Sequence, residues 1–138
     1  MKILITGGHL TPALAVIDKL IDLKEKIAIV FVGKKYAIDS EQSISLEYKE
    51  VSKRNISFVS LQAGRITRIV SLRGLASIFK IPLGFFHAFA IVRQERPSAI
   101  LTFGGHIALP IAIMGKLFNI SVFTHEQTIA PGLSNRVI

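Results

Sequence analysis

The sequence predicts an α/β domain with a Rossmann-like parallel sheet that carries helices on both faces. Short runs of β-branched and other apolar residues alternate along the chain with segments of helical periodicity. Polar or glycine-rich turns follow three of these runs. The chain has 138 residues, half of them hydrophobic and under a fifth charged. This is enough for one domain with a substantial core, and it argues against disorder.

The elements follow one another in a regular order. We expect strands over residues 2–6, 27–32, 56–61, 98–103 and 120–124. We expect helices over residues 11–23, within 37–53, over 71–93 and over 107–118, the third with a break or kink near Pro82 and Gly84. We also expect a further helix to begin near residue 133, cut off at about its second turn. Strands separated by helices form βαβ units, so the sheet should be parallel.

Composition excludes several classes of protein and site. The chain has no cysteine, which rules out disulfides, thiolate metal sites and a cysteine nucleophile. The N-terminal residues lack the long apolar region of a signal peptide. Residues 97–115 are uncharged and long enough to span a membrane. However, Gly104 and Gly105 in their middle and Pro110 soon after favour a strand, a turn and a helix.

The net charge of +8 predicts an anionic partner. Basic residues and bulky apolar residues are mixed on helical spacing between residues 65 and 96, which suits a membrane surface better than nucleic acid. Some of the phenylalanines should instead face the core, and we expect about half of them to be buried. The candidate membrane residues are Arg73, Ile78, Phe79, Lys80, Phe85, Phe86 and Phe89.

Two further basic residues point to phosphate binding. Arg65 and Arg68 lie just past the end of the predicted strand 56–61. The forked guanidinium group of arginine matches the geometry of phosphate oxygens. Both side chains could therefore reach a phosphorylated substrate.

The first glycine turn, Gly7-Gly8-His9, follows the predicted first strand. Glycines let backbone amides approach an anion, and Thr11 with Pro12 can begin a helix whose N-terminus favours negative charge. His9 could act there as a general base. Taken alone, the segment is better read as a tight strand-to-helix turn with a solvated histidine, because a glycine pair is a weak signal.

A similar turn, Gly104-Gly105-His106, follows the predicted strand 98–103. Open α/β sheets bind ligands at the carboxyl ends of their strands. Two such turns together indicate a cleft with two anion-binding loops that face a diphosphate. The alternative is that both glycine pairs serve packing.

A third polar segment, His125-Glu126-Gln127-Thr128, directly follows the last predicted strand. Its side chains can hydrogen-bond a sugar or orient a base. The alternative is an ordinary polar loop that caps the next helix. Metal binding is not favoured, because no second cluster of ligands has suitable spacing.

Together these segments resemble the N-terminal domain of the MurG family, the N-acetylglucosaminyltransferases of peptidoglycan synthesis in glycosyltransferase family 28. The resemblance covers essentially the whole chain. It rests on the order MKILITGG and HLTPALAV, then AGRITR, then ILTFGGHIALP, then HEQTIAPGLSNR. The combination of HEQ and PGLSNR with two upstream glycine turns is specific, although each piece alone is weak.

The resemblance implies a GT-B fold, in which two Rossmann-like halves enclose a cleft. The N-terminal half, here residues 1–138, would bind the acceptor and the membrane, and a C-terminal UDP-sugar domain would lie outside this chain. The implied reaction is inverting transfer of N-acetylglucosamine from UDP-N-acetylglucosamine to the muramyl 4-hydroxyl of lipid I, with no metal or cofactor. The enzyme would be peripheral, at the cytoplasmic face of the bacterial inner membrane with its anionic lipids. This chain alone should not turn over.

The resemblance also suggests site residues. His9 and Glu126 are the catalytic candidates, with His9 as base or acceptor-orienting group. The candidate substrate-binding residues are Gly7, Gly8, Thr11, Arg65, Arg68, Gly104, Gly105, His106, Gln127 and Thr128.

The chain departs from the family pattern at several points. The first glycine turn is shorter than the usual GGGTGGH. His106 stands where the family often has an aromatic residue, and Thr128 where it usually has asparagine. These differences bear on how phosphate is held and on where His9 lies.

The sequence leaves three alternatives open. One is a GT-B enzyme with another lipid acceptor, such as diacylglycerol. Another is a non-catalytic, membrane-anchoring subunit of a split glycosyltransferase. The third, a nucleotide-binding Rossmann domain, ranks last, because the first turn lacks the G-x-G-x-x-G spacing and Val32-Gly33-Lys34 supplies no acid at the end of the second strand.

Overall fold

A computed structural model describes residues 1–23, 26–37, 43–61, 72–126 and 133–138, with side chains left undescribed at 72–81 and 133–134. Its centre is a five-stranded parallel sheet in the order β3-β2-β1-β4-β5. The strands are β1 (Lys2–Thr6), β2 (Ala28–Gly33), β3 (Ser57–Ser60), β4 (Ala99–Thr102) and β5 (Ser121–Thr124). The helices are α1 (Leu10–Asp22), α2 (Leu46–Ser52), α3 (Leu72–Glu95), α4 (Gly105–Leu117) and α5 (Leu133–Val137). The predicted α/β class with a parallel sheet is confirmed.

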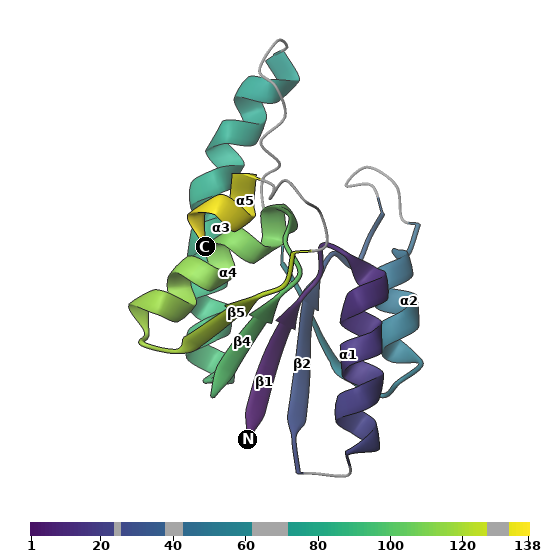
Figure 1. Cartoon of the computed structure of the whole chain (residues 1–138). Coiled ribbons are helices and arrows are strands. Elements are labelled where there is room, and N and C mark those ends of the chain that lie inside the picture. The colour runs from purple at the N-terminus through teal and green to yellow at the C-terminus, as the bar shows by residue number, and fades with distance from the viewer. Residues whose placement is uncertain (24–25, 38–42, 62–71, 127–132) are drawn as a thin grey trace.

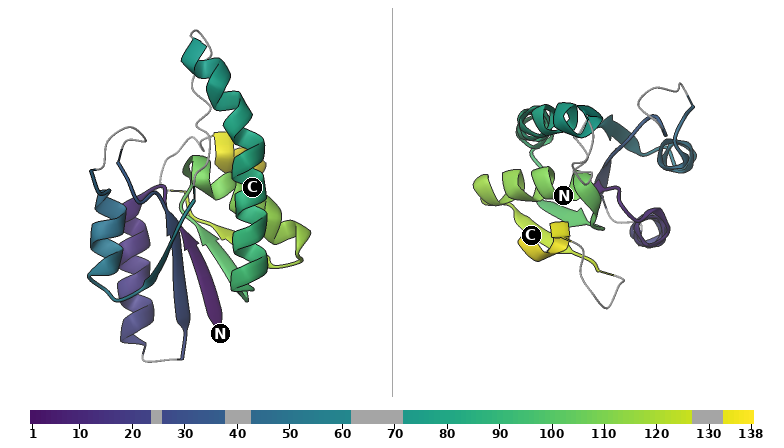
Figure 2. Two further views of the ribbon diagram at one scale, coloured as in Figure 1. Left: turned by 180° about the vertical axis from the view of Figure 1, so that it is seen from behind. Right: turned by 90° about the horizontal axis from the view of Figure 1, so that it is seen from above.

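Helices cover both faces of the sheet, α1 and α2 on one and α3 and α4 on the other (Figures 1 and 2). The alternation of side chains along a strand explains why two separate cores form. Leu4 belongs to the core under α3 and α4, with Ile91 and Ile111, whereas the next residue, Ile5, belongs to the core under α1, with Ile17. All of these side chains are buried.

The strand order places β1 between β2 and β4. The chain leaves β1 toward β2 on one face, and it reaches β4 over the other face by way of α3. Neighbouring strands whose connections run in opposite directions leave a crevice at their carboxyl ends. The turns after β1 and β4, which carry the glycine pairs, lie at this crevice.

The largest difference from the sequence prediction is in α3. The sequence predicts a break or kink near Pro82 and Gly84, and α3 runs unbroken through both residues. A proline removes one backbone donor, and packing compensates for that loss here, because Ala88, Ile91 and Val92 of α3 are buried against the sheet and α4. In the part of the chain that the structure describes, no helix combines the length and apolar character needed to cross a membrane.

Two helix starts also differ from the prediction. α1 begins at Leu10, with His9 as its N-cap, so Thr11 lies within the first turn and does not begin the helix. α4 begins at Gly105, earlier than the predicted residue 107, because Gly104 and Gly105 both adopt positive φ and turn the chain directly into the helix.

Candidate functional site

The two glycine turns touch one another at the carboxyl edge of the sheet. Gly8 has φ of 145°, and a Cβ atom placed on it would lie only 2.2 Å from the carbonyl oxygen of Gly104. A Cβ atom on Gly105 would come within 3.2 Å of the Gly8 Cα atom. Only glycine allows backbones to approach so closely with positive φ. The structure therefore brings together the two turns that the sequence singled out.

Each turn leads into the N-terminus of a 13-residue helix, α1 after the first and α4 after the second. Neither helix has an acidic residue in its first turn, and neither N-cap residue donates or accepts a side-chain capping bond. Unsatisfied backbone N–H groups and the positive end of the helix dipole make such positions suitable for anions. Two of them at one edge can together hold a group with more than one negative charge.

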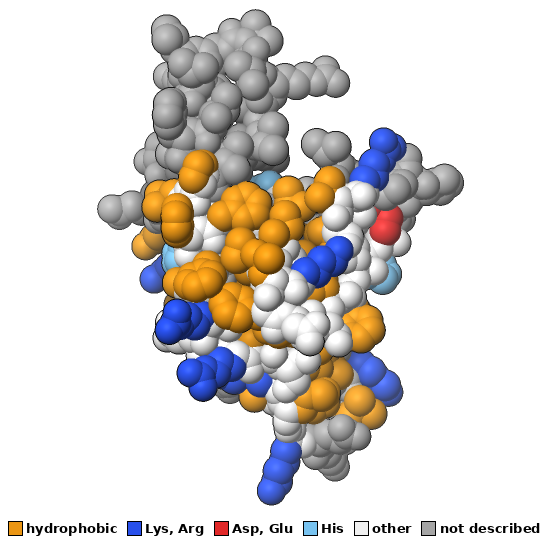
Figure 3. Space-filling model, turned by 90° about the vertical axis from the view of Figure 1, so that its left-hand side faces the viewer, with side chains coloured by type: hydrophobic (Ala, Val, Ile, Leu, Met, Phe, Trp, Pro, Cys, Tyr) orange, Lys and Arg blue, Asp and Glu red, His pale blue; other side chains and the backbone are white. Residues whose placement is uncertain are grey.

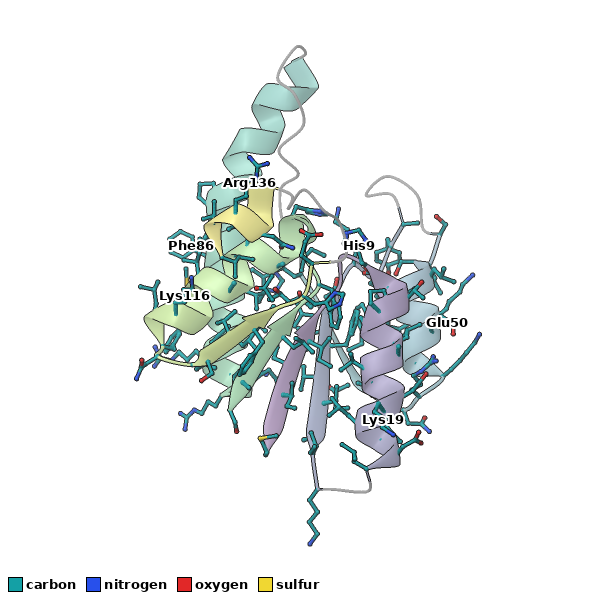
Figure 4. All side chains as sticks on the ribbon, viewed as in Figure 1. His9, Lys19, Glu50, Phe86, Lys116 and Arg136 are labelled. Carbon is teal, nitrogen blue, oxygen red and sulfur yellow. The ribbon has the colours of Figure 1, made fainter. Side chains whose placement is uncertain are left out.

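His9 lies at the start of α1, beside the crevice (Figure 4). Its side chain is exposed, so the imidazole is open to a ligand. A neutral imidazole with this access can accept a proton from a substrate hydroxyl group. The position of His9 agrees with its predicted role, which itself stays a prediction.

Glu126 follows β5 and is held by a residue that the sequence interpretation did not include in the site. The Nδ2 atom of Asn135 donates a hydrogen bond to the Glu126 carboxylate at 2.7 Å. The amide group of Asn135 also lies against Gly104, where a Cβ atom would be 3.2 Å from it. Asn135 therefore connects α5, the segment after β5 and the second glycine turn.

His125 packs beside the end of β4. Its ring lies 5.5 Å from the ring of Phe103, centroid to centroid, and its backbone N–H donates to the Thr102 carbonyl oxygen at 2.9 Å. The Thr102 and Thr124 hydroxyl groups form a hydrogen bond of 3.0 Å across β4 and β5. These contacts fix the backbone that leads to Glu126.

A cavity of about 330 Å³ opens beside the glycine turns. The turns contribute Gly8, Gly105 and His106 to its lining. The segment between β2 and α2 contributes Lys34 and Tyr36, and α2 contributes Glu47. His106, a predicted substrate-binding residue, thus lies in the cavity wall together with residues that the sequence interpretation did not select.

An exposed apolar surface covers the side of the molecule formed by α3, α4 and α5 (Figure 3). On α3, Leu83, Phe86 and Phe89 recur every third residue, and Phe86 is 74% exposed. The Phe89 ring lies 5.3 Å from the ring of Phe118 at the end of α4. We call Leu83, Phe86, Phe89, Leu117 and Phe118 the apolar surface; each of these side chains is at least 40% exposed.

Basic residues accompany the apolar surface. Arg93 on α3, Lys116 on α4 and Arg136 on α5 are exposed. Of the predicted membrane residues, Phe86 and Phe89 are exposed and Phe85 is half-buried. The others, Arg73, Ile78, Phe79 and Lys80, lie on α3 at positions whose side chains are not described.

Four predicted substrate-binding residues lie outside the described residues: Arg65, Arg68, Gln127 and Thr128. The structure brings Gly8 against Gly104 and Gly105, and Asn135 joins Gly104 to Glu126. His106 lines the same cavity as Gly8 and Gly105. The remaining predicted residues, Gly7, His9 and Thr11, follow β1 at the first turn and the start of α1. Among the residues that are described, no three His, Asp or Glu side chains are grouped as a metal site requires.

Comparison with known proteins gives a consistent family match. Residues 6–138 match the glycosyltransferase family 28 N-terminal domain. A relative from Borreliella afzelii, named UDP-N-acetylglucosamine–N-acetylmuramyl-(pentapeptide) pyrophosphoryl-undecaprenol N-acetylglucosamine transferase, is 31% identical over 132 residues, which are 96% of this chain and 34% of that protein. A relative of the same name from Clostridium perfringens is 31% identical over 140 residues, 99% of this chain and 36% of its own length. The chain thus spans about a third of the length of these relatives.

Solved structures agree with this match. The crystal structure of MurG from Acinetobacter baumannii superposes with a TM-score of 0.75 at 25% identity, over 99% of this chain and 38% of that one. A glycosyltransferase of kitacinnamycin shares the fold with a TM-score of 0.59 at 12% identity, over 89% of this chain and 29% of that one.

Proposed function

The chain belongs to glycosyltransferase family 28, as its N-terminal domain, and from this premise we propose that it is the acceptor-binding half of a peptidoglycan N-acetylglucosaminyltransferase. The acceptor would be lipid I, the undecaprenyl-diphosphate-linked muramyl pentapeptide. The sugar donor would be UDP-N-acetylglucosamine, bound by a second domain. The names of the relatives support both substrates.

One observation carries this proposal, the contact between the Gly8 and Gly104 turns at the N-termini of α1 and α4. A diphosphate needs several donors directed at one place, and two helix N-termini supply them without desolvating a lysine or arginine side chain. Bound there, the diphosphate would fix one end of the acceptor beside His9.

The chemistry proposed for the site is a single displacement. The acceptor 4-hydroxyl oxygen attacks the anomeric carbon of the donor sugar, UDP leaves, and the hydroxyl proton passes to a base on the acceptor side. His9 is the candidate base, because it is exposed at the start of α1. Glu126, held by Asn135, is the candidate for orienting the hydroxyl group or the histidine.

The apolar surface supports a peripheral position on a membrane. An undecaprenyl acceptor remains in the bilayer, so its enzyme must work at the lipid surface. Exposed phenylalanines beside arginine and lysine match the acyl–headgroup boundary of anionic lipids. We place the protein at the cytoplasmic face of the bacterial inner membrane, where a nucleotide sugar would be available.

A chimera tests the proposal. Residues 1–138 would replace the matched segment of the Clostridium perfringens relative, which supplies the rest of that protein. The chimera should transfer N-acetylglucosamine from UDP-N-acetylglucosamine to lipid I, and this chain alone should bind lipid I in micelles without transferring sugar. Failure of a folded chimera to use lipid I while it uses another lipid acceptor would contradict the acceptor assignment.

A further inference from the structure

We propose that the cavity beside the glycine turns is a subsite for the polar head of the acceptor, with Glu47 as its hydrogen-bond acceptor. The proposal rests on the proposed function, because it concerns the same acceptor. It assigns the side of the cavity that Glu47 forms to uncharged N–H or O–H donors, which the peptide and the muramyl sugar both carry.

The carboxylate of Glu47 is held firmly in place. Its Oε2 atom accepts a hydrogen bond from the Lys34 backbone N–H at 3.2 Å. The carboxylate lies against two backbones, since a Cβ atom on Gly7 would be 2.6 Å from Oε1 and one on Gly33 would be 2.8 Å from Oε2. The glycines at the ends of β1 and β2 therefore leave space that this side chain fills.

The start of α2 is fixed as well. Ser45 is the N-cap, and its Oγ atom accepts a hydrogen bond from the Tyr48 backbone N–H at 3.1 Å. The same hydroxyl group donates to the Lys34 carbonyl oxygen. Glu47 is thus positioned by its own contacts and by a helix start that is tied to the end of β2, an arrangement suited to recognition.

Glu47 gives the cavity wall a hydrogen-bond acceptor. An ionised carboxylate only accepts hydrogen bonds, so its part of the wall suits N–H and O–H donors. Lys34 also lines the cavity, and the charge of Glu47 is therefore an argument about its own side of the cavity only. Ala37 and Ile107 give the lining an apolar part that can contact methyl groups. A ligand with amide or hydroxyl donors next to small apolar groups could therefore donate to Glu47 and contact this apolar part at the same time.

The location of the cavity agrees with this assignment. Its wall includes Lys34, Tyr36 and Ala37, which follow β2, and Glu47 of α2. In Figure 1, α2 lies on the other side of the sheet from α3 and α4, which carry the apolar surface. An acceptor with its lipid toward the apolar surface and its diphosphate at the turns would extend its head toward the cavity. A volume of about 330 Å³ is at the small end for ligand pockets, so it would hold part of the head.

Direct binding to the full chain tests the subsite without lipid or diphosphate. The probes are N-acetylmuramyl-L-alanyl-D-isoglutamine, which carries the start of the peptide, and the methylamide of N-acetylmuramic acid, which carries no amino acid and no lactyl carboxylate. In amide NMR titrations the first probe should shift the signals of Gly8, Tyr36 and Gly105. Equal binding of both probes assigns the subsite to the sugar, and binding of the first alone assigns it to the peptide. Binding of neither probe at the cavity overturns the proposal.

Variants of Glu47 provide the second test. Glu47→Ala should weaken binding of the probe about tenfold or more, as expected for the loss of a hydrogen bond to a charged group. Glu47→Gln keeps an oxygen for the Lys34 N–H, so it should retain wild-type stability and yet lose affinity. The matched control is Glu50→Ala, a glutamate one turn further along α2 that pairs with Lys53 and Arg54 outside the cavity. Wild-type affinity in Glu47→Gln and Glu47→Ala would overturn the subsite.

The chimera separates this proposal from the proposed function. In it, Glu47→Gln should raise the KM for lipid I and leave the KM for UDP-N-acetylglucosamine unchanged. If the chimera transfers sugar and its KM for lipid I is the same with Glu47 as with Glu47→Gln, the subsite is contradicted and the proposed function is not. A chimera that does not transfer sugar, although the chain binds the muramyl probe at the cavity, contradicts the proposed function alone.

Discussion

Asn135 on α5 donates a hydrogen bond to the carboxylate of Glu126 at 2.7 Å, and its amide group lies directly over Gly104. The two residues are separated by a segment outside the described residues, yet they meet beside the second glycine turn. This hydrogen bond restricts the orientation of the Glu126 carboxylate group. Asn135 is therefore a positioning residue for Glu126 in the proposed site.

Removing this hydrogen bond should lower turnover. In the chimera, Asn135→Ala should reduce kcat about 10- to 100-fold, because a hydrogen bond to a charged group contributes roughly 1.5–3 kcal/mol. The KM for UDP-N-acetylglucosamine should not change. Asn135→Asp, which places a like charge beside Glu126, should be at least as damaging. Steady-state kinetics decide this, with Val137→Ala as the control, because Val137 is exposed on the same helix and is not part of the apolar surface as defined. Full activity of Asn135→Ala would show that the mechanism does not need Asn135 to orient Glu126.

His9 should matter more for the chemical step than for binding. If it accepts the proton of the acceptor hydroxyl, His9→Ala should lower kcat of the chimera by about 100-fold or more and change the KM for lipid I little. His87→Ala is the matched control, because this half-buried histidine lies on α3 and does not line the cavity beside the glycine turns. A variant with unchanged kcat would remove His9 from the chemical step.

The fold could be predicted because its signals are local. Each strand is a short apolar run, and each helix has its own periodicity, so the elements and the parallel sheet follow from neighbouring residues. Pro82 shows the limit of that reasoning. The sequence predicts a break at a proline, whereas burial of Ile91 and the residues around it against α4 keeps the helix continuous.

The site could be predicted only in part, because its contacts are between distant segments. The two glycine turns are visible as a repeated pattern, but their contact depends on β1 lying next to β4. Asn135 and Glu47 have no such pattern. Asn135 is one polar residue in a short helix, and Glu47 resembles any acid in the first turn of a helix. Their importance emerges only from the groups that the fold places beside them.

The contact between the glycine turns should be intolerant of a methyl group. A Cβ atom on Gly8 would lie 2.2 Å from the Gly104 carbonyl oxygen, at a φ of 145° that L-residues avoid. Gly8→Ala should therefore lower the free energy of unfolding by about 1–3 kcal/mol, measured by urea denaturation. Asn119→Gly, at a left-handed φ of 58° outside the turns, should change stability little. Equal denaturation midpoints for Gly8→Ala and the wild type would show that the two turns can move apart to accept the methyl group without loss of stability.

The ion pair between α1 and the end of α2 should make stability depend on pH. Arg54 donates to both carboxylate oxygens of Asp18, at 2.6 and 3.0 Å, and this hydrogen bonding lowers the pKa of Asp18 below its ordinary value. A carboxyl group with a lower pKa in the folded state stabilises the fold above its unfolded pKa, and the contribution is lost as pH falls through the folded pKa. The effect should be small and sensitive to salt, because the pair is exposed.

Arg54→Gln should return the pKa of Asp18 toward its ordinary value and flatten the fall in stability in acid. NMR titration of the Asp18 carboxyl carbon measures the first effect directly. Lys53→Ala is the control, because Lys53 lowers the pKa of Glu50 and does not contact Asp18. An unchanged Asp18 pKa in Arg54→Gln would contradict the assigned cause.

The apolar surface should bind anionic membranes, and Phe86 and Phe89 should contribute most. Burying one phenylalanine side chain is worth about 1.5–3 kcal/mol. Replacing both phenylalanines by serine should therefore weaken binding to vesicles of phosphatidylglycerol and phosphatidylethanolamine by at least about 100-fold in co-sedimentation. The matched control is Ile21→Ser with Leu23→Ser, which removes two exposed apolar side chains at the end of α1.

The charge contribution can be separated from the apolar one by salt. Arg93→Glu with Lys116→Glu should weaken vesicle binding at low ionic strength and should matter much less at high ionic strength, where surface attraction is screened. The serine pair should weaken binding at both ionic strengths, because burial of apolar area is not screened. If neither pair changed co-sedimentation while the protein still bound vesicles, the membrane contact would have to lie on another face of the molecule.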